Sequence, residues 1–310
     1  MFHQIVEIQE EKRYISLYRG FLVIKADNKE LGRVPLDDIA VLLISAQGAF
    51  LTKNILVELA ERGAITIFCG KNYAPQSIVY PLTYHYKLAG ILKYQINVNL
   101  PFKKQCWKQI TQIKLQNQAK SLRLCAKNKE AKKLEYIATT VKSGDPENRE
   151  GYGARLYWTA LFGESFVRDQ NGKDINALLN YGYAIIRSAM ARALCSAGLN
   201  LSLGVHHDNA LNPFCLADDF LEIYRPLVDV IVFLIQKDKC KNIELTHDLK
   251  TKLIKVIWIK MKTTEGSSPV FQSMQYMATS YVKALQNKEC HFEIPIWEGK
   301  YDEFSSIEQV

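Results

Sequence analysis

The chain has 310 residues, of which 48% are hydrophobic and 11% aromatic, a composition typical of a folded globular protein and not of a disordered one. No apolar run approaches the roughly 20 residues that cross a bilayer, and the first residues lack the pattern of a secretory signal. We therefore expect a cytoplasmic protein with no membrane association. The net charge is +8, and residues 103–133 alone hold nine lysines and Arg123 against the single acid Glu130.

This basic segment has two interpretations. A concentrated positive charge is expected where a protein binds the phosphates of a nucleic acid. A lysine-rich helix face that is merely exposed to water gives the same pattern.

The seven cysteines are widely spaced and form no C-x-x-C pair, which argues against a disulfide framework and against a zinc site. We expect them to be buried thiols. They are Cys69, Cys106, Cys125, Cys195, Cys215, Cys240 and Cys290.

Residues 1 to about 80 are predicted to be β-rich. Segments 14–26, 32–45 and 64–70 are rich in β-branched and aromatic residues and are interrupted by glycine, proline and aspartate. One helix is predicted between them, with Thr52 as its N-cap and Gly63 at its end. Residues 73–82, which contain two prolines, are expected at the edge of this region.

Helical spacing dominates from about Tyr84 almost to the end, and the tail after about Pro295 is expected to be loose. The predicted fold class is α+β. A small β-rich domain spans residues 1–83, and a larger helical domain spans residues 84–310.

The segment "GDPENREGYGARLYW", residues 144–158, predicts the start of a helix. Asp145 can accept hydrogen bonds from free backbone N–H groups, and Pro146 suits the first helical position. Glu150 then falls in the second turn. Gly151 and Gly153 each weaken a helix by about 1 kcal/mol relative to alanine, which suggests close approach by another helix or by a ligand.

A further helix is predicted to begin near Asp218, with an apolar face and an opposite acidic face. The acids are Asp219, Glu222 and Asp229. Just upstream, the loop segment "GVHHDN" contains His206 and His207. Carboxylates and an imidazole that converge from separate segments can bind a divalent metal ion. Each feature alone is also typical of an exposed helix face, a surface acid or a polar loop.

Taken in order, these segments resemble the CRISPR-associated integrase/endonuclease family, the larger of the two universal spacer-acquisition proteins. The resemblance is strongest to members from type II, Cas-nine-containing systems. It covers nearly the whole chain and depends on "LLISAQGAFLTKNILVELAERG", "YPL", "GDPENREGYGARLYW", "INALLNYGYAIIRSAMARALCSAGL" and "LGVHHDNALNPFCLADDFLEIYRPLVD". An ordered set of this kind is far more specific than an isolated short motif.

The resemblance implies a β-sandwich-like N-terminal domain used in dimerisation, followed by an all-α catalytic, DNA-binding domain. It implies a metal-dependent DNA integrase and endonuclease that inserts captured DNA fragments as spacers. In this reaction a 3′-hydroxyl attacks a phosphodiester at the end of a CRISPR repeat.

The family's catalytic metal ligands match Glu150, His207 and Glu222, with Mg²⁺ or Mn²⁺ as the expected cofactor. His207 is preferred to His206 because its fifteen-residue separation from Glu222 fits the family better. His206 and Asp219 are expected to support the site. The residues expected to bind DNA are Lys120, Arg123, Lys127 and Arg155.

The implied particle is two homodimers bridged by one dimer of the smaller adaptation protein. Its further partners are double-stranded DNA fragments, CRISPR repeat DNA and the effector nuclease of a type II system. Two alternatives remain open at this point: a metal-dependent nuclease that cuts branched DNA during repair, and a DNA-binding scaffold without catalysis.

Overall fold

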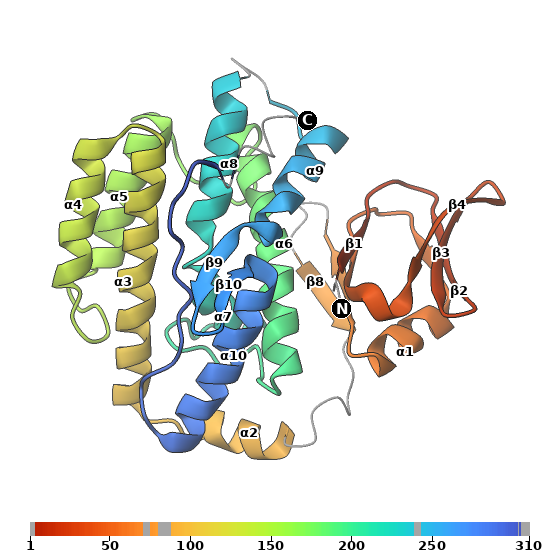
Figure 1. Ribbon diagram of the computed structural model, residues 1–310, viewed down its shortest axis with the longest axis horizontal. Coiled ribbons are helices and arrows are strands. Elements are labelled where there is room, and N and C mark those ends of the chain that lie inside the picture. Colours follow the sequence, from red (N-terminus) through yellow and green to blue (C-terminus); the bar gives the residue numbers. More distant parts are fainter. Residues whose placement is uncertain (1–3, 71–74, 80–87, 239–242, 303, 305–310) are drawn as a thin grey trace. The chain divides into compact units, whose positions relative to one another are not determined.

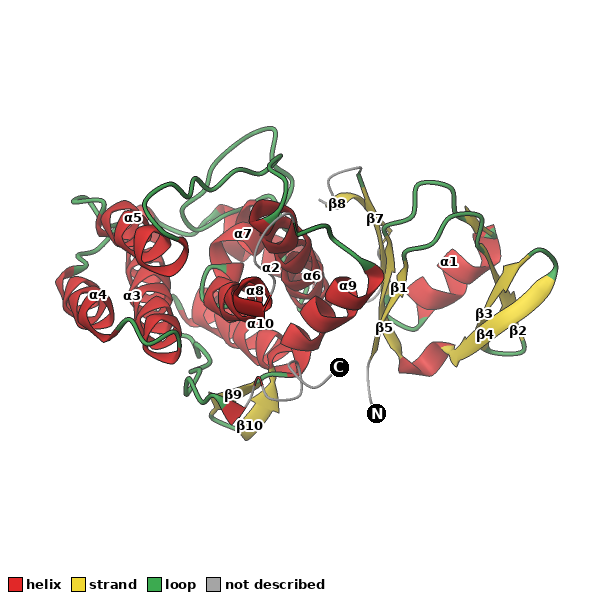
Figure 2. Ribbon diagram, turned by 90° about the horizontal axis from the view of Figure 1, so that it is seen from above, coloured by secondary structure: helices red, strands yellow, loops and turns green. Residues whose placement is uncertain are grey.

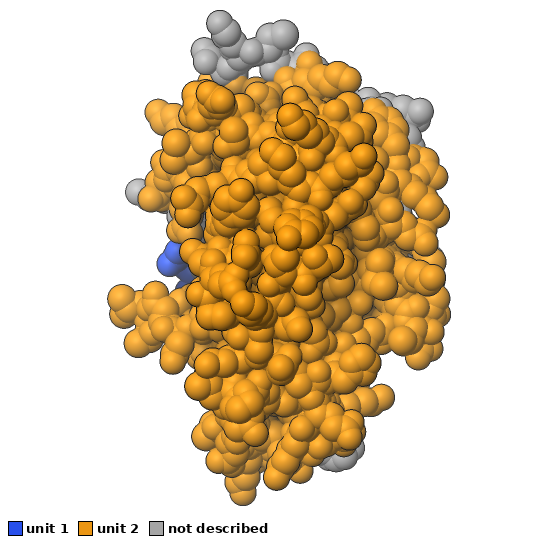
Figure 3. Space-filling view, turned by 90° about the vertical axis from the view of Figure 1, so that its left-hand side faces the viewer, with its two compact units in different colours: residues 1–88 blue, residues 89–310 orange. Residues whose placement is uncertain are grey.

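The computed structural model describes residues 4–70, 75–79, 88–238, 243–302 and 304 (Figure 1). The chain forms two compact units, residues 1–88 and residues 89–310, and each has its own hydrophobic cluster. Figure 3 shows a face of the second unit in orange. The domain boundary predicted between residues 83 and 84 lies outside the described residues.

The first unit contains two four-stranded sheets, which confirms the β-sandwich-like prediction. One sheet has the order β1-β5-β7-β8, in which the first three strands are parallel and β8 is an antiparallel edge strand, and the other has the order β4-β3-β2-β6. Ile15 and Leu22 from the second sheet share one core with Leu42 and Ile44 from the first. The strands are β1 (Gln4–Ile8), β2 (Tyr14–Tyr18), β3 (Phe21–Ala26), β4 (Lys29–Pro35), β5 (Ile39–Ile44), β6 (Phe50–Leu51), β7 (Ile65–Cys69) and β8 (Pro75–Val79), with the 3₁₀ turn η1 (Leu36–Asp38) before β5.

Helix α1 (Lys53–Glu61) occupies the predicted position in this unit. Thr52 has the extended backbone of an N-cap, although its side chain makes no capping hydrogen bond. Gly63 has a φ of 74°, a conformation that favours glycine, and its N–H donates to the carbonyl of Ala60. Leu59 anchors the helix in the core of the first unit.

The second unit is mainly helical. Helices α3, α4 and α5 pack side by side, and the almost fully buried helix α6 contacts α7, α8, α9 and α10 (Figures 1 and 2). The elements are α2 (Leu88–Ile96), α3 (Leu100–Leu124), α4 (Asn128–Thr140), α5 (Arg149–Phe162), α6 (Ile175–Ser196), α7 (Cys215–Leu221), α8 (Arg225–Asp238), α9 (His247–Ile254), η2 (Lys255–Trp258), β9 (Lys260–Thr263), β10 (Gly266–Pro269) and α10 (Val270–Asn287). The β9–β10 hairpin is an addition to the all-α architecture expected here. Among the described residues, no helix is long and apolar enough to cross a membrane.

The single helix predicted from Asp218 onward is wrong, because the chain forms two helices with a break between them. Helix α7 ends at Leu221 and α8 begins at Arg225, so Glu222 lies at the break. Pro226 accounts for it: proline has no N–H to donate, and its ring clashes with the carbonyl four residues earlier, that of Glu222. The tight turn is closed by a hydrogen bond from the Tyr224 N–H to the Leu221 carbonyl.

The predicted start of the helix that carries Glu150 is also wrong. Helix α5 begins at Arg149, after the N-cap Asn148, and not at Pro146. Asp145 does accept backbone N–H groups, as expected: those of Arg149 at 2.8 Å and Glu150 at 2.9 Å. Glu150 therefore lies in the first turn of the helix and not in the second.

The described part of the tail after Pro295, residues 296–302 and 304, is not loose at its start, which corrects a third expectation. Ile296 exchanges two backbone hydrogen bonds with Lys262, at 2.8 and 2.9 Å. The Trp297 side chain is fully buried, and its carbonyl accepts a hydrogen bond from Lys120 Nζ. This segment is part of the folded helical unit.

The six cysteines that the structure describes are free thiols. Cys106, Cys125 and Cys215 are buried as expected, whereas Cys69, Cys195 and Cys290 are only partly buried. Cys240 lies outside the described residues.

Asp229 is a buried acid in the core of the helical unit. It accepts hydrogen bonds from the hydroxyls of Tyr157 on α5, at 2.9 Å, and Tyr183 on α6. Burial raises its pKa to about 7, although both hydroxyls favour the ionised form. Between about pH 4 and pH 7, Asp229 keeps its proton in the folded protein but has released it in the unfolded chain. The free energy of unfolding should therefore fall as the pH rises through this range.

We expect Asp229→Asn to remove this part of the pH dependence. The difference in melting temperature, wild type minus variant, should decrease by on the order of 5 °C between pH 5 and pH 8. Thermal unfolding of both proteins across this pH range measures it. A difference that stayed constant would show that Asp229 has an ordinary pKa in the folded protein.

Candidate active site

Two of the predicted metal ligands, Glu150 and Glu222, meet at one lysine. Lys114 on α3 forms an ion pair with Glu150 on α5, and its Nζ lies 2.6 Å from Glu222 Oε2. The other oxygen of Glu222 pairs with Arg225 Nη1 at 2.9 Å. Only 8% of the Lys114 side chain and 5% of the Glu222 side chain are exposed. The site therefore combines residues from α3, α5 and the turn between α7 and α8.

The oppositely charged side chains of this cluster stabilise each other's ionised forms. Burial disfavours the charged form of Lys114, but Glu222 and Glu150 outweigh it and raise its pKa. Burial likewise disfavours ionisation of Glu222, but Arg225 and Lys114 hold the pKa of this carboxyl below its ordinary value. Lys114 and Glu222 are therefore both charged at neutral pH.

Helix α3 also fixes the turn that carries Glu222. Asn117 Nδ2 donates to the carbonyl of Ile223 at 2.8 Å, and Ser121 Oγ donates to the carbonyl of Pro226 at 3.1 Å. The Ile223 carbonyl needs this partner because the helix break takes it out of the regular helical pattern. One face of α3 therefore carries a buried polar stripe that contacts the turn between α7 and α8. It consists of Lys114, Asn117 and Ser121.

Glycine lets α5 approach α3 closely enough to bring Glu150 to this stripe. A Cβ at Gly153 would lie 2.3 Å from Leu115 Cδ2, so no larger residue fits without a shift. The close approach expected from the glycines of this segment is thus helix packing at Gly153. A Cβ at Gly151 would instead meet the side chain of the helix's own N-cap, Asn148.

Asp219 holds the loop that carries both histidines. Its carboxylate accepts the backbone N–H groups of Val205, His206 and His207 at 2.6, 2.9 and 3.2 Å. A Cβ at Gly204 would lie 2.2 Å from the His207 carbonyl oxygen, so the tight loop requires glycine there. Asp219 is fully buried and serves this loop.

The two histidine rings have different partners. His207 Nδ1 lies 2.6 Å from Asp219 Oδ1, and this hydrogen bond raises its pKa. His206 stacks on Trp107 of α3, with ring centroids 4.1 Å apart and an interplanar angle of 4°. Burial lowers the pKa of His206. With Nδ1 bonded to a carboxylate, the His207 ring has Nε2 left for a ligand, the usual arrangement of a metal-binding histidine.

A second ion pair holds the rest of the loop. Arg187 on α6 donates to both oxygens of Asp218, at 2.7 and 2.6 Å, and to Asn212 Oδ1 at 3.1 Å. Asn212 Nδ2 in turn donates to Asp218 Oδ2 at 2.7 Å. Neighbouring acids at the start of α7 therefore both position the loop that precedes it.

The residues present suit a divalent cation in chemistry. Two carboxylates and an imidazole are the donors that such ions prefer, and the buried Glu222 Oε2 accepts no hydrogen bond of normal geometry even though Lys114 is near. Within the described part of the chain, however, no three His, Cys, Asp or Glu side chains form a group that could hold a metal ion. The Lys114 ammonium lies between the two carboxylates, where a metal ion would bind.

The acidic residues of this region are not an exposed helix face, so that interpretation is wrong. Asp219, Glu222 and Asp229 are all buried. Each has a separate environment: a loop backbone, a pair of cations and a pair of tyrosines.

The predicted DNA contacts lie in different settings. Lys120 is half-buried and holds the Trp297 carbonyl, and Arg123 donates to both oxygens of Glu135, each at 2.6 Å. Lys127 at the start of α4 and Arg155 on α5 are exposed. Exposed cations of this kind are available to phosphates. Lys120 would instead have to give up its hydrogen bond to the Trp297 carbonyl in order to bind a phosphate.

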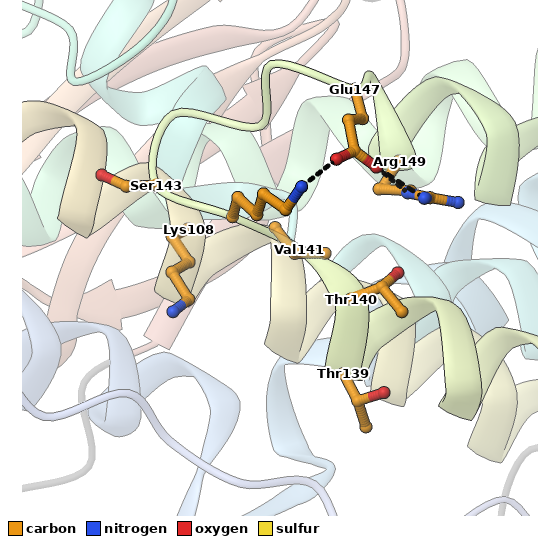
Figure 4. A pocket seen from close by; sticks show the side chains of 8 residues that line it. Lys108, Thr139, Thr140, Val141, Ser143, Glu147 and Arg149 are labelled. Atoms are coloured by element: carbon orange, nitrogen blue, oxygen red, sulfur yellow. Dashed lines mark hydrogen bonds and ion pairs between the residues drawn. The ribbon is translucent and has the colours of Figure 1, made fainter.

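A pocket of about 610 Å³ lies beside the loop that leads into α5 (Figure 4). Glu147 in this loop pairs with Lys142 and, at 2.5 Å, with Arg149 Nη2. The pocket is lined by Lys108, Thr139, Thr140, Val141, Lys142, Ser143, Glu147 and Arg149. Three of these residues are basic, and Arg149 directly precedes Glu150.

The sequence did not reveal Lys114, Asn117 and Ser121 as part of the site. Their spacing of three and four residues places them on one face of a helix, which was the available signal. The other residues of the basic segment concealed it, because a buried lysine cannot be told from an exposed one by its spacing.

Comparison with known proteins gives one consistent result. The family model described as CRISPR associated protein Cas1 matches residues 6–256. The CRISPR-associated endonuclease Cas1 of Neisseria meningitidis is 38% identical over 274 residues, which cover 88% of this chain and 90% of that protein.

Solved structures share the fold. A casposase bound to an integration product superposes with a TM-score of 0.78 at 17% identity, covering 99% of this chain and 96% of that one. A chain of a Cas6-RT-Cas1–Cas2 complex gives 0.75 at 19% identity, covering 93% of this chain but only 35% of that longer one. The family model and the Neisseria meningitidis relative confirm the family resemblance seen in the sequence: the chain belongs to the CRISPR-associated protein Cas1 family.

Proposed function

We propose that this protein is a metal-dependent DNA integrase and endonuclease of CRISPR adaptation. Membership of the Cas1 family supports the class of activity, since the relative from Neisseria meningitidis is named an endonuclease. The observation that carries the proposal is the carboxylate pair of the partly buried Glu150 and the buried Glu222, beside a histidine that is oriented by Asp219. A scaffold without catalysis would have no need of two acids that meet at one buried cation.

Glu150, Glu222 and Nε2 of His207 would hold Mg²⁺ or Mn²⁺. Such an ion, when bound, stabilises negative charge on the oxygens of a reacting phosphodiester. Asp219 keeps the His207 ring in the required tautomer and orientation, and Arg225 holds the second oxygen of Glu222. His206, stacked on Trp107, fixes the loop without providing a ligand.

In the proposed reaction the 3′-hydroxyl of a captured DNA fragment attacks a phosphodiester at the end of a CRISPR repeat, and the 3′-oxygen of the adjoining repeat nucleotide leaves as a hydroxyl. Water in place of the hydroxyl would give strand cleavage at the same site. Lys108, Lys142 and Arg149, which line the pocket before α5, are suited to bind DNA phosphates beside Glu150.

The smaller adaptation protein, Cas2, is the proposed partner. The fold shared with a chain of a complex that contains Cas2 supports this assignment. We propose that two homodimers of this chain are bridged by one Cas2 dimer, and that the effector nuclease of a type II system supplies fragments. The first unit would mediate dimerisation, since Tyr14, Tyr18 and Phe50 expose aromatic rings on one face of its second sheet.

The first test compares the two histidines. His207→Ala should abolish Mn²⁺-dependent integration into a repeat-bearing plasmid, because it removes a ligand. His206→Ala should keep measurable activity, with a loss of about 10- to 100-fold, because it weakens only the packing of the loop. Both variants should keep the wild-type melting temperature within a few degrees.

The reverse ranking would assign the ligand to His206. Plasmid joining also separates the proposal from its main alternative: a repair nuclease would cut branched DNA in the same assay without yielding strand-transfer products.

The second test concerns DNA binding. Replacing the exposed Lys127 and Arg155 by alanine should weaken binding to all duplex sequences alike and reduce the salt dependence by ~0.9 for each lost phosphate contact. Replacing Lys260 and Lys283, two exposed lysines elsewhere in the same unit, is the matched control. Equal salt slopes in the two double variants would mean that these predicted contacts do not bind DNA.

The third test concerns self-association. Serine at Tyr14, Tyr18 and Phe50 removes the exposed rings, so sedimentation of the full chain should shift from dimer to monomer at micromolar concentration. Serine at Leu88, Tyr94 and Ile96, which are exposed on α2, provides the control. A persistent dimer in the first variant would exclude this face from the interface.

A further inference from the structure

Lys114 is the one feature of the site that a plain set of metal ligands does not explain. It is buried in α3, yet it carries a charge directly between two acids that come from α5 and from the α7–α8 turn. A buried charge is costly unless it is paired, so the Lys114 ammonium is expected to neutralise the two carboxylates that it contacts.

The charges of the cluster cancel without any metal ion. Glu150 and Glu222 contribute two negative charges, and Lys114 and Arg225 contribute two positive ones. Arg225 pairs with Glu222, whereas Lys114 pairs with both acids. The Lys114 ammonium therefore occupies the position that a divalent ion bound to both carboxylates would take. Two positive charges a few ångströms apart in a buried site repel strongly.

We infer that Lys114 is a tethered cation that positions Glu150 and Glu222 in the metal-free protein and competes with the divalent ion for them. Metal binding exchanges one cation for another, so the ammonium must leave at least one carboxylate as the ion enters. The carboxylates stay assembled in both states, but the affinity for the ion is lower than that of the same ligands without the lysine. This inference deepens the proposed function and rests on its metal site.

Lys114→Gln tests the competition, with Mn²⁺ binding measured by electron paramagnetic resonance on the DNA-free protein. The variant should bind Mn²⁺ at least about tenfold more tightly than the wild type, because the repelling charge is gone. It should also melt at a lower temperature without metal and recover more of its stability on addition of Mn²⁺. Lys114→Arg, which keeps the charge, should retain the weaker binding of the wild type.

Lys104→Gln is the matched control, because it removes an exposed lysine from the same helix. Its Mn²⁺ affinity should equal that of the wild type. A purely structural Lys114, which only holds the acids in place, would instead give unchanged or weaker Mn²⁺ binding in Lys114→Gln, and that result would overturn the inference.

Glu222→Gln separates the two proposals. If the wild type binds Mn²⁺ and Glu222→Gln does not, the metal site stands, and the behaviour of Lys114→Gln alone decides the inference. If neither the wild type nor Lys114→Gln binds Mn²⁺, the metal site and the inference both fall. Should Lys114→Gln fail to fold without metal, folding in the presence of Mn²⁺ supports the exchange, and failure in both conditions contradicts it.

Discussion

The break between α7 and α8 is the constraint on which the rest of the site depends. Pro226 cannot continue a helix from the preceding turn, so Glu222 stands where the chain is least regular and Ile223 has a carbonyl without its usual partner. Helix α3 supplies partners at the break: Asn117 donates to the free Ile223 carbonyl, Ser121 donates to the carbonyl of Pro226 at the start of α8, and Lys114 forms an ion pair with the Glu222 carboxylate. The position of Glu222 is therefore set by a helix more than a hundred residues away in sequence.

The same principle appears around each acid of the region. Asp218 is held by Arg187 of α6, Asp219 by the backbone of its preceding loop, and Asp229 by two tyrosines from α5 and α6. Buried acids need such partners, and because each partner is different, each acid fixes a different part of the helical unit. Rigid support of this kind gives a site in which only a few groups remain available for a substrate.

Local sequence signals predicted the elements well where the structure depends on local interactions. The strands of the first unit, helix α1 and the long helix α6 follow from residue type and periodicity. Family resemblance predicted Glu150 and Glu222, which the structure places at one lysine. The failures share a cause. The start of α5 depends on Asn148 in a left-handed conformation, and the role of Lys114 depends on contacts between distant helices, neither of which periodicity can report.

The contact between Lys120 and Trp297 has a consequence for the order of folding. Lys120 and Trp297 are 177 positions apart in the sequence. Nearer the start of α3, Cys106 contacts Cys290, which is 184 positions away. Helix α3 therefore stays partly uncovered during synthesis until the last segments of the helical unit have emerged. The first unit, residues 1–88, has its own hydrophobic core and can fold before that. The nascent chain would thus carry a finished β unit while the helices of the second unit are still partly exposed to water.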